Sequence, residues 1–266
     1  MAVEYSPENS LRIQREANMS NNSILPVWTE QFRVRHTEVT REGFLRADVF
    51  FDYMQEAAAN HAKHIGVGLE ALNSIGLMWV LSRLKLQVLH TPLLGETISV
   101  TTWPSGIERL FATREFILKN ENEEIVARAS SCWILLDQIR MHPRKVLETL
   151  PAKLPDNSAR ERNFTNLEKL PRLPVSNPSR MRIPESMIDV NRHMNNARYV
   201  TEAFDWLAET QGTAPRIAEI QVNFLAGTAA DAVLETAGTI DGNRFYVESS
   251  VGTDPHFQAS GTLQDS

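Results

Sequence analysis

Apolar residues in the first half of the chain recur first with the period of a helix and then in strand-like runs. Across residues 47–64 and just beyond, one set of positions is spaced at i, i+4, i+7, i+8, i+11 and i+15: Phe50, Met54, Ala57, Ala58, His61 and Ile65. This spacing puts them on one face of a helix, and the alanines allow close approach to a sheet. A strand is predicted before the helix at residues 32–39. A short helix near residues 68–74 and strands at 79–89, 96–103, 111–120 and 125–136 are predicted after it.

The second half repeats this plan. Four of its positions keep the spacing of the first four helix positions above: Tyr199, Ala203, Trp206 and Leu207. A strand is predicted before that helix, at residues 181–188, and the strand residues 220–222 echo residues 86–88. A strand, a long helix and several antiparallel strands, twice over, form an α+β arrangement. The recurrence favours an internal duplication, with two unrelated α+β halves as the alternative.

The boundaries between these parts follow from polar and proline-rich stretches. Residues 1–26 are rich in polar side chains and are predicted to be disordered. Residues 27–150 form the first predicted unit, and residues 179–266 form the second. Residues 151–178 are predicted to be a linker, because proline interrupts both helix and sheet pairing. Its prolines are Pro151, Pro155, Pro171, Pro174 and Pro178.

Composition narrows the classes of protein that fit. The chain has 266 residues, 42% of them hydrophobic and 23% charged, which is typical of a globular protein. A formal net charge of −6 argues against a general nucleic-acid binder. The single cysteine, Cys132, excludes an intrachain disulfide and a multi-cysteine zinc site. No transmembrane run or secretory signal is expected, so the cytoplasm is the predicted compartment.

The segment DVNRHMNN at residues 189–196 carries the strongest chemical signal. It spaces Asp189, Asn191 and His193 two residues apart, and an extended backbone turns alternate side chains to the same side. An imidazole can move protons near neutral pH, while an amide and a carboxylate can orient its partners. Asn195 and Asn196 follow where a helix is predicted to begin. The non-functional alternative is a capped loop, in which Asp and Asn side chains bond backbone N–H groups.

This segment resembles the D-x-N-x-H-x-N-N motif of acyl-acyl-carrier-protein thioesterases. MWVLSRL at residues 78–84 resembles the W-V-L-S-R segment of that family, and residues 96–104 resemble the strand that follows it. The resemblance extends from about residue 32 to about residue 263. It implies a tandem, or double, hotdog fold of the α+β class, in which antiparallel sheets each wrap around a long central helix.

The resemblance also implies an activity. We expect hydrolysis of acyl-acyl-carrier-protein, which releases free fatty acid and ends chain elongation in fatty acid biosynthesis. No metal or organic cofactor is implied, and a homodimer is left open. An acyl-CoA thioesterase would use the same motif, because both substrates share the phosphopantetheine arm. A non-catalytic acyl-binding hotdog protein is the alternative from another class.

Roles for individual residues follow from the resemblance and from the internal repeat. Asp189, Asn191 and His193 are the predicted catalytic residues. Asn195 and Asn196 are predicted to cap the helix and to help bind the thioester oxygen. Alignment of Tyr199 with Phe50 puts Phe44 opposite His193 and Thr40 opposite Asp189. The chemistry is therefore predicted in the second half, and the acyl-chain pocket in the first.

The chain departs from the plant members of the family at one position. Those proteins carry a glutamate in the strand after the motif helix, and the match puts Gly227 there. The role of the glutamate is therefore either dispensable in this chain or taken by another group. The candidates for that group are Gln221, Asn223 and Asp231.

A short basic cluster at Arg140, His142, Arg144 and Lys145 is a predicted contact for an acidic carrier protein, with a solvated loop as the alternative. Arg83, Lys85 and Arg198 are possible extensions.

Two other residue types are given structural roles. His61 and His64 lack a third metal ligand in view, and Cys132 is predicted to be a small core residue.

Overall fold

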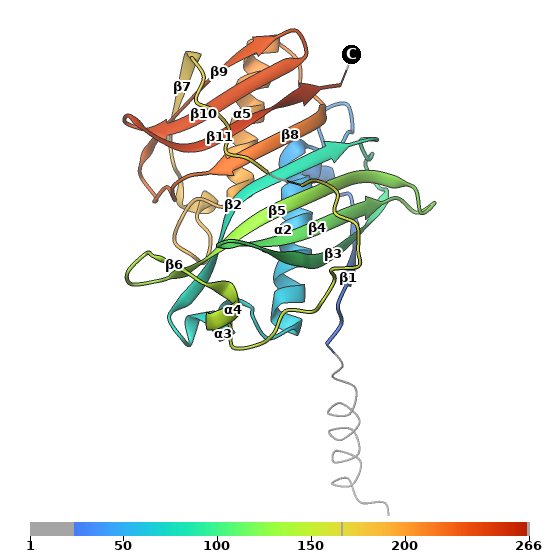
Figure 1. Cartoon of the computed structure of the whole chain (residues 1–266). Helices are drawn as coiled ribbons and strands as arrows, with labels where there is room; N and C mark the ends of the chain where they lie inside the picture. The colour runs from blue at the N-terminus through green and yellow to red at the C-terminus, as the bar shows by residue number, and fades with distance from the viewer. Residues whose placement is uncertain (1–23, 166, 265–266) are drawn as a thin grey trace, which may run out of the picture.

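The computed structural model describes residues 24–165 and 167–264 (Figure 1). Most of the segment predicted to be disordered, residues 1–26, lies outside these ranges. Within them, no helix is both long enough and apolar enough to cross a membrane.

The first half contains the predicted strand, long helix and run of strands. Its long helix, α2, begins and ends at the residues expected from the apolar spacing. The elements are β1 (Trp28–Arg33), the 3-10 turn η1 (His36–Glu38), α2 (Ala47–His64), α3 (Leu69–Asn73), β2 (Leu77–Val88), β3 (Thr97–Glu108), β4 (Phe111–Lys119), β5 (Ile125–Asp137), β6 (Pro143–Arg144) and α4 (Val146–Thr149).

The second half repeats the order of elements. These are β7 (Ser176–Arg182), the 3-10 turn η2 (Glu185–Met187), α5 (Asn196–Gln211), β8 (Ile217–Phe224), β9 (Val233–Asp241), β10 (Arg244–Val251) and β11 (Asp254–Leu263). The helix α5 starts after Asn195, whose side chain accepts a hydrogen bond from the Ala197 N–H at 2.9 Å. It ends at Gly212, which adopts a left-handed conformation with φ of 75°.

The strands of both halves form one antiparallel sheet rather than two separate ones. Their order is β1-β3-β4-β5-β2-β8-β11-β10-β9-β7, with β6 paired to β5. The halves join where β2 pairs with β8, so that Leu84 lies opposite Val222 and Leu86 opposite Ile220. Pairing satisfies backbone groups that would otherwise be exposed at two sheet edges. Both long helices pack on the same face of this sheet (Figure 1).

Two predicted strands end earlier than their sequence patterns suggested. The first ends at Arg33 rather than at residue 39, because His36–Glu38 forms a 3-10 turn. The buried Glu38 carboxylate accepts hydrogen bonds from the Arg35 N–H and the Tyr53 hydroxyl, both at 2.8 Å. The strand predicted at 181–188 instead covers Ser176–Arg182 and ends before Pro184. A proline cannot donate to a strand ladder, which explains that end.

One hydrophobic core runs beneath both halves of the sheet. The predicted helix face of α2 supplies Phe50, Met54 and Ala57, each no more than 1% exposed. Tyr199, Ala203 and other buried residues of α5 continue it. The two helices are also tied directly, since the Arg198 guanidinium contacts the Asp52 carboxylate. This core fixes the ends of the helices, where the motif lies.

The predicted linker crosses the opposite face of the sheet as a strap, defined here as residues 157–165 and 167–172. In Figure 1 it passes in front of the strands from the first half to the second. Within the described part of residues 151–175 there is no helix or strand. The strap meets the centre of the sheet where Arg83 donates to the Leu167 carbonyl and Gln221 to the Glu168 carbonyl, both at 2.6 Å.

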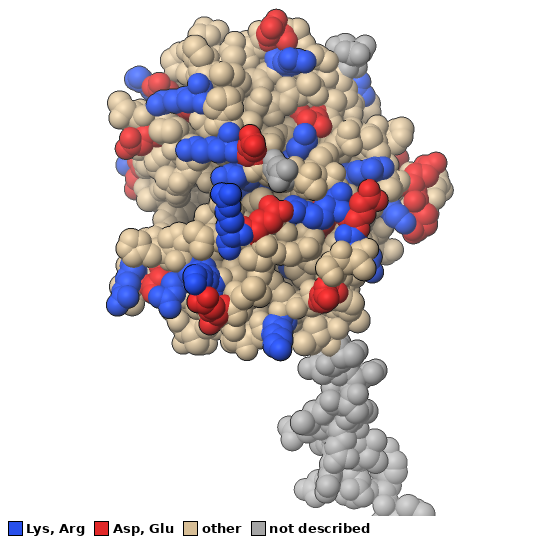
Figure 2. Space-filling model, in the orientation of Figure 1, with Lys and Arg blue, Asp and Glu red and all other residues tan. Residues whose placement is uncertain are grey.

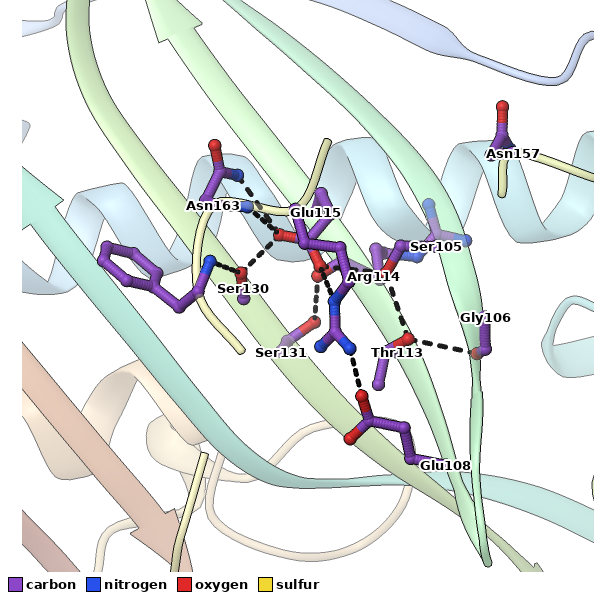
Figure 3. Close-up of polar contacts among 12 residues, drawn as sticks. Ser105, Gly106, Glu108, Thr113, Arg114, Glu115, Ser130, Ser131, Asn157 and Asn163 are labelled. Atoms are coloured by element: carbon purple, nitrogen blue, oxygen red, sulfur yellow. Dashed lines mark hydrogen bonds and ion pairs between the residues drawn. The ribbon is translucent and has the colours of Figure 1, made fainter. Parts of the chain in front are cut away.

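A buried carboxylate holds the start of the strap. Glu115 on β4 is fully buried and accepts from five donors (Figure 3). Its Oε2 accepts from the Ser130 hydroxyl and from the Asn163 backbone N–H and side-chain amide, the last two at 3.0 and 3.3 Å. Its Oε1 accepts from the Ser105 hydroxyl at 2.9 Å and from Arg162 Nε at 3.2 Å. Charge-assisted bonds of this kind make the carboxylate a strong anchor.

Candidate active site

The motif lies in a tight loop that leads into α5. Ile188 pairs with Met194, and the five residues between them turn the chain back. The Asp189 N–H donates to the His193 carbonyl, and the Arg192 N–H donates to the Asp189 carbonyl, both at 2.9 Å. The Asp189 carboxylate accepts from the Asn191 N–H at 2.8 Å. Asp189 therefore has the turn-forming role of the non-functional alternative, and one of its oxygens remains without a described partner.

The first half contains the same loop without the Asp, Asn and His side chains of the motif. Val39 pairs with Leu45, the Thr40 N–H donates to the Phe44 carbonyl at 2.8 Å, and the Gly43 N–H donates to the Thr40 carbonyl at 3.0 Å. Thr40 and Phe44 thus occupy the places of Asp189 and His193, as the internal alignment predicts. The Arg216 guanidinium lies 4.7 Å from the centre of the Phe44 ring.

Asp189, Asn191 and His193 all line one cavity of about 950 Å³. Asp189 and His193 are half-buried, and Asn191 is exposed. Most of the remaining wall comes from the first half, including Ala58, Ala62, Val67, Leu72, Trp79 and Leu81. The cavity is therefore composite, with the motif side chains from one half and a largely apolar lining from the other.

The structure brings the three motif side chains to one cavity without pairing them to each other. Apart from the backbone bond from the Asp189 N–H to the His193 carbonyl, no hydrogen bond joins His193 to Asp189 or Asn191 within the described ranges. The two asparagines separate in role: Asn195 caps α5, whereas Asn196 lines the cavity. The Asn196 N–H, the first of the helix, donates to no described residue, and it lies at the positive end of the helix dipole.

Gly227 lies directly against the His193 ring, at the position where the resemblance expects a glutamate. A Cβ atom on Gly227 would lie 2.6 Å from His193 Cδ2 and 2.8 Å from Cγ. The three candidate substitutes for the glutamate do not line the cavity. Gln221 bonds the strap, Asp231 pairs with Arg182, and Asn223 is buried elsewhere. None of the three therefore lies where the glutamate side chain would be, because alternate residues of β8 face the strap and Asp231 lies beyond the strand. The alternative that the role of the glutamate is dispensable stays open.

Comparison with known protein families gives two matches, one for each half of the chain. The profile of the acyl-ACP thioesterase N-terminal domain matches residues 26–154, and that of the C-terminal domain matches residues 174–258. The chain belongs to the acyl-ACP thioesterase family.

Relatives of this thioesterase family member include an acyl-acyl-carrier-protein hydrolase of Cuphea viscosissima, 26% identical over 242 residues, or 81% of this chain and 55% of the relative. Oleoyl-acyl carrier protein thioesterase 1 of Arabidopsis thaliana is 24% identical over 69% of this chain and 54% of its own length. The chain thus spans about half the length of these two chloroplastic relatives.

Solved structures show the fold. An acyl-ACP thioesterase from Bacteroides thetaiotaomicron has a TM-score of 0.78 at 23% identity, over 90% of this chain and 98% of that one. The 12:0-ACP thioesterase of Umbellularia californica has a TM-score of 0.74 at 22% identity, with the same coverage. This member of the family has the tandem hotdog fold.

Gln55 is a cavity residue that sequence reasoning missed. It lies on α2 and lines the cavity with Asn196, and its side chain makes no hydrogen bond within the described ranges. With Ala58, Ala59 and Ala62 it falls at i, i+3, i+4 and i+7, which is one helix face. That spacing was readable in the sequence, but it competed with the more apolar face that packs on the sheet.

Arg114 is a second missed residue, a buried cation in the cavity wall of this thioesterase family member. Its Nη1 lies 3.1 Å from His61 Nδ1 and 3.2 Å from the Thr102 hydroxyl, and no described carboxylate forms an ion pair with it. Burial lowers the pKa of Arg114 to about 10 and, with the Arg114 charge, that of His61 to about 4.

His61 and His64 fix the chain near residue 25 rather than forming a metal pair. His61 Nε2 is 2.9 Å from the Leu25 carbonyl, and His64 Nε2 accepts from the Leu25 N–H. Among the residues that the structure describes, no group of three or more His, Cys, Asp or Glu could hold a metal ion. Cys132 is buried in β5, which raises the pKa of its thiol to about 11, as expected for a core residue.

The predicted carrier contact lies beside the cavity. Met141, between Arg140 and Arg144, lines the cavity together with Val190 of the motif loop. Lys145 pairs with Glu148 at 2.9 Å. Figure 2 shows Lys and Arg side chains gathered at the lower left, where Figure 1 places β6 and α4.

The suggested extensions of this cluster do not belong to it. Arg83 bonds the strap carbonyl of Leu167, Lys85 pairs with Glu219, and Arg198 pairs with Asp52. The sequence alone does not show which surface these side chains face.

Proposed function

We propose that this chain hydrolyses the thioester of acyl-acyl-carrier-protein, releasing free fatty acid and so ending chain elongation in fatty acid biosynthesis. The observation that carries the proposal is the composite cavity. It brings Asp189, Asn191 and His193 together with a largely apolar lining in one cavity of about 950 Å³. A thioesterase needs a proton acceptor for water and a dry space for an acyl chain, and this cavity supplies both.

The motif residues take the following roles in the proposed reaction. The His193 imidazole accepts a proton from water as the water oxygen forms a bond to the thioester carbonyl carbon. Asn191 holds the water, and the Asp189 carboxylate offsets the positive charge that develops on the ring. The Asn196 N–H at the start of α5 donates to the carbonyl oxygen as it becomes negative. The carbon–sulfur bond then breaks, and the imidazolium returns its proton to the departing thiolate.

The acyl chain occupies the part of the cavity built by the first half. Ala58 and Ala62 of α2 form one wall, and Trp79 and Leu81 of β2 form another. Small alanine side chains leave the volume open, and aliphatic and aromatic groups bury the chain away from water. The first half therefore sets which chain length fits.

The carrier protein binds at the rim beside residues 139–145. Arg140 and Arg144 are exposed there, and neither has an ion-pair partner in the described ranges. Exposed apolar side chains accompany them, with Ile139 at 90% and Leu147 at 82%. A basic rim around apolar contacts suits an acidic carrier protein, because charge steers encounter and apolar burial holds the complex.

The decisive experiment compares carriers. Dodecanoyl and hexadecanoyl groups are presented on acyl carrier protein and on coenzyme A, and free thiol is measured. We expect kcat/KM at least about tenfold higher with the carrier protein. Equal or reversed rates would favour an acyl-CoA thioesterase. Retention of the acyl group without thiol release would favour a non-catalytic acyl-binding protein.

A charge reversal tests the proposed rim. Arg140→Glu combined with Arg144→Glu should lower kcat/KM for acyl carrier protein by about tenfold, with acyl-N-acetylcysteamine hydrolysed as before. Arg244→Glu, at an exposed position at the start of β10, is the matched control. Equal effects of both changes on the carrier substrate would remove Arg140 and Arg144 from the interface.

The compartment and the oligomeric state stay predictions. The single cysteine favours a reducing compartment such as the cytoplasm. Cell fractionation and sedimentation of the purified chain test the location and the possible homodimer, respectively.

A further inference from the structure

Three side chains behind the motif loop form a hydrogen-bonded chain. The Tyr199 hydroxyl donates to Thr228 Oγ1 at 2.7 Å, and Thr228 Oγ1 lies 2.7 Å from His256 Nδ1. The Thr228 hydroxyl donates to His256 Nδ1 in one imidazole tautomer and accepts from Nδ1–H in the other, so it bonds both side chains in either case. Tyr199 and Thr228 are almost completely buried, at 2% and 1% exposed. These residues come from α5, from the β8–β9 connection and from β11.

The hydrogen bonds among Tyr199, Thr228 and His256 lie beside backbone bonds that anchor the segment in contact with His193. The Thr228 carbonyl accepts from the N–H of Met194, the residue directly after His193, at 2.8 Å. The His256 carbonyl accepts from the N–H groups of Leu225 and Ala226, at 2.8 and 3.3 Å. Residues 225–228 are therefore held from both ends, with Gly227 between the fixed points and its backbone against the imidazole ring.

The first half has the same backbone contact without the side-chain bonds. There the Leu45 N–H donates to the Pro92 carbonyl at 2.8 Å, as the Met194 N–H does to Thr228. Pro92 thus takes the place of Thr228, and Phe50 that of Tyr199, so neither position has a hydroxyl. The hydroxyl chain occurs in the half that has the imidazole and is missing from the half that has Phe44. A purely structural need of the loop would apply to both halves.

We propose that Tyr199, Thr228 and His256 are positioning residues for His193, which fix residues 225–228 so that the Gly227 backbone forms a wall against the imidazole. This rests on the proposed function only in taking His193 as the reacting group. The ring is held by packing at the place where the resemblance expects a glutamate side chain. With His193 in its present position, a side chain at residue 227 has no room.

Conservative changes at Thr228 test the proposal. Thr228→Val keeps the shape and removes both hydrogen bonds, whereas Thr228→Ser keeps the hydroxyl. We expect Thr228→Val to lower kcat about tenfold with KM within about twofold, and Thr228→Ser to restore kcat to within about twofold. Thr236→Val is the matched control, since Thr236 is also buried and its hydroxyl pairs with Ser249 at 2.9 Å away from the cavity. A Thr228→Val variant with the kcat of Thr236→Val would overturn the proposal.

Two further variants test the proposal if the Thr228→Val protein does not fold. Tyr199→Phe keeps the buried ring and removes the hydroxyl that contacts Thr228 Oγ1 and, at 3.5 Å, the Ala226 carbonyl. We expect a smaller fall in kcat in the same direction. Gly227→Ala adds a methyl group that must displace the His193 ring, and we expect kcat to fall at least about tenfold. Wild-type kcat in both variants would contradict the assignment.

A spectroscopic readout separates this inference from the proposed activity. The His193 imidazole resonances, assigned by comparison with His193→Gln, are recorded in the full-length chain by NMR. They should shift in Thr228→Val and Gly227→Ala and stay unchanged in Thr236→Val. Unchanged His193 resonances in the first two variants would refute positioning, even if the chain hydrolyses acyl thioesters. Shifted resonances in a chain that hydrolyses none would refute the activity alone.

Discussion

The stability of the chain should depend on Glu115, the buried carboxylate that holds the strap. In Glu115→Gln, an amide oxygen at the Oε2 position can still accept from Ser130 and from both Asn163 groups. The new NH₂ group then faces the Ser105 hydroxyl, which can turn to accept, and Arg162 Nε, which cannot. One charge-assisted bond is lost, at a cost of about 1.5–3 kcal/mol.

Glu115→Ala removes all five bonds. The Ser130 hydroxyl, Arg162 Nε and the Asn163 backbone N–H are then left without a described acceptor, whereas the Ser105 hydroxyl and the Asn163 amide keep their other partners. We expect it to lower the free energy of unfolding by about 3–5 kcal/mol, the range for breaking a buried charged pair. The matched control is Glu108→Gln, which removes the other carboxylate partner of Arg162. The Glu108 side chain is 44% exposed, so solvent screens its pair and the expected cost is at most about 1 kcal/mol.

Thermal unfolding followed by circular dichroism measures these differences. For a chain of this size, Glu115→Gln should lower Tm by roughly 3–12 °C, and Glu108→Gln by far less. Limited trypsin digestion reports on the strap itself, since Arg160, Lys169 and Arg172 lie within it. The reasoning fails if Glu115→Gln and Glu108→Gln unfold at the same temperature and are cleaved at the same rate.

Three further outcomes are expected at the proposed site. His193→Ala should fold normally and lose at least about 100-fold in kcat, and a fully active variant would remove His193 from the reaction. Asp189→Asn and Asn191→Ala should lower kcat more than they raise KM, because both residues act on the reacting groups; a change confined to KM would reassign them to binding. Ala58→Phe should shorten the preferred acyl chain, measured as the product profile. Its overpacking cost of about 1–3 kcal/mol is followed by thermal unfolding, and a stable variant with an unchanged profile would place the acyl chain elsewhere.

The helices could be predicted closely because the spacing of apolar side chains along the sequence shows which helix face is buried. Phe50, Met54 and Ala57 are buried at the intervals that define the α2 face. The first strand was less predictable, since Glu38 belongs to a 3-10 turn whose carboxylate is satisfied by Tyr53, far along the chain. The β2–β8 junction had no clear sequence signal, because backbone pairing between two strands depends weakly on which side chains they carry.

The candidate site was predictable where its residues are contiguous and not where the fold assembles it. Asp189, Asn191 and His193 line one cavity, as their spacing suggested. Gln55 and Arg114 enter that cavity from α2 and β4, and no local pattern connects them to the motif. Alignment located Gly227 opposite the family glutamate, but its contact with the His193 ring could not be predicted from the sequence, because it depends on how two loops pack in the fold.

Phe44, which takes the place of His193 in the first half, has a consequence for stoichiometry. Two identical hotdog units would offer two equivalent reaction sites, whereas this chain retains the imidazole at one. A non-hydrolysable acyl thioether should therefore saturate at one equivalent per chain with a simple hyperbolic isotherm. A single chain has no second reaction site whose affinity the first could change. Any cooperativity in acyl binding would therefore have to arise between separate chains.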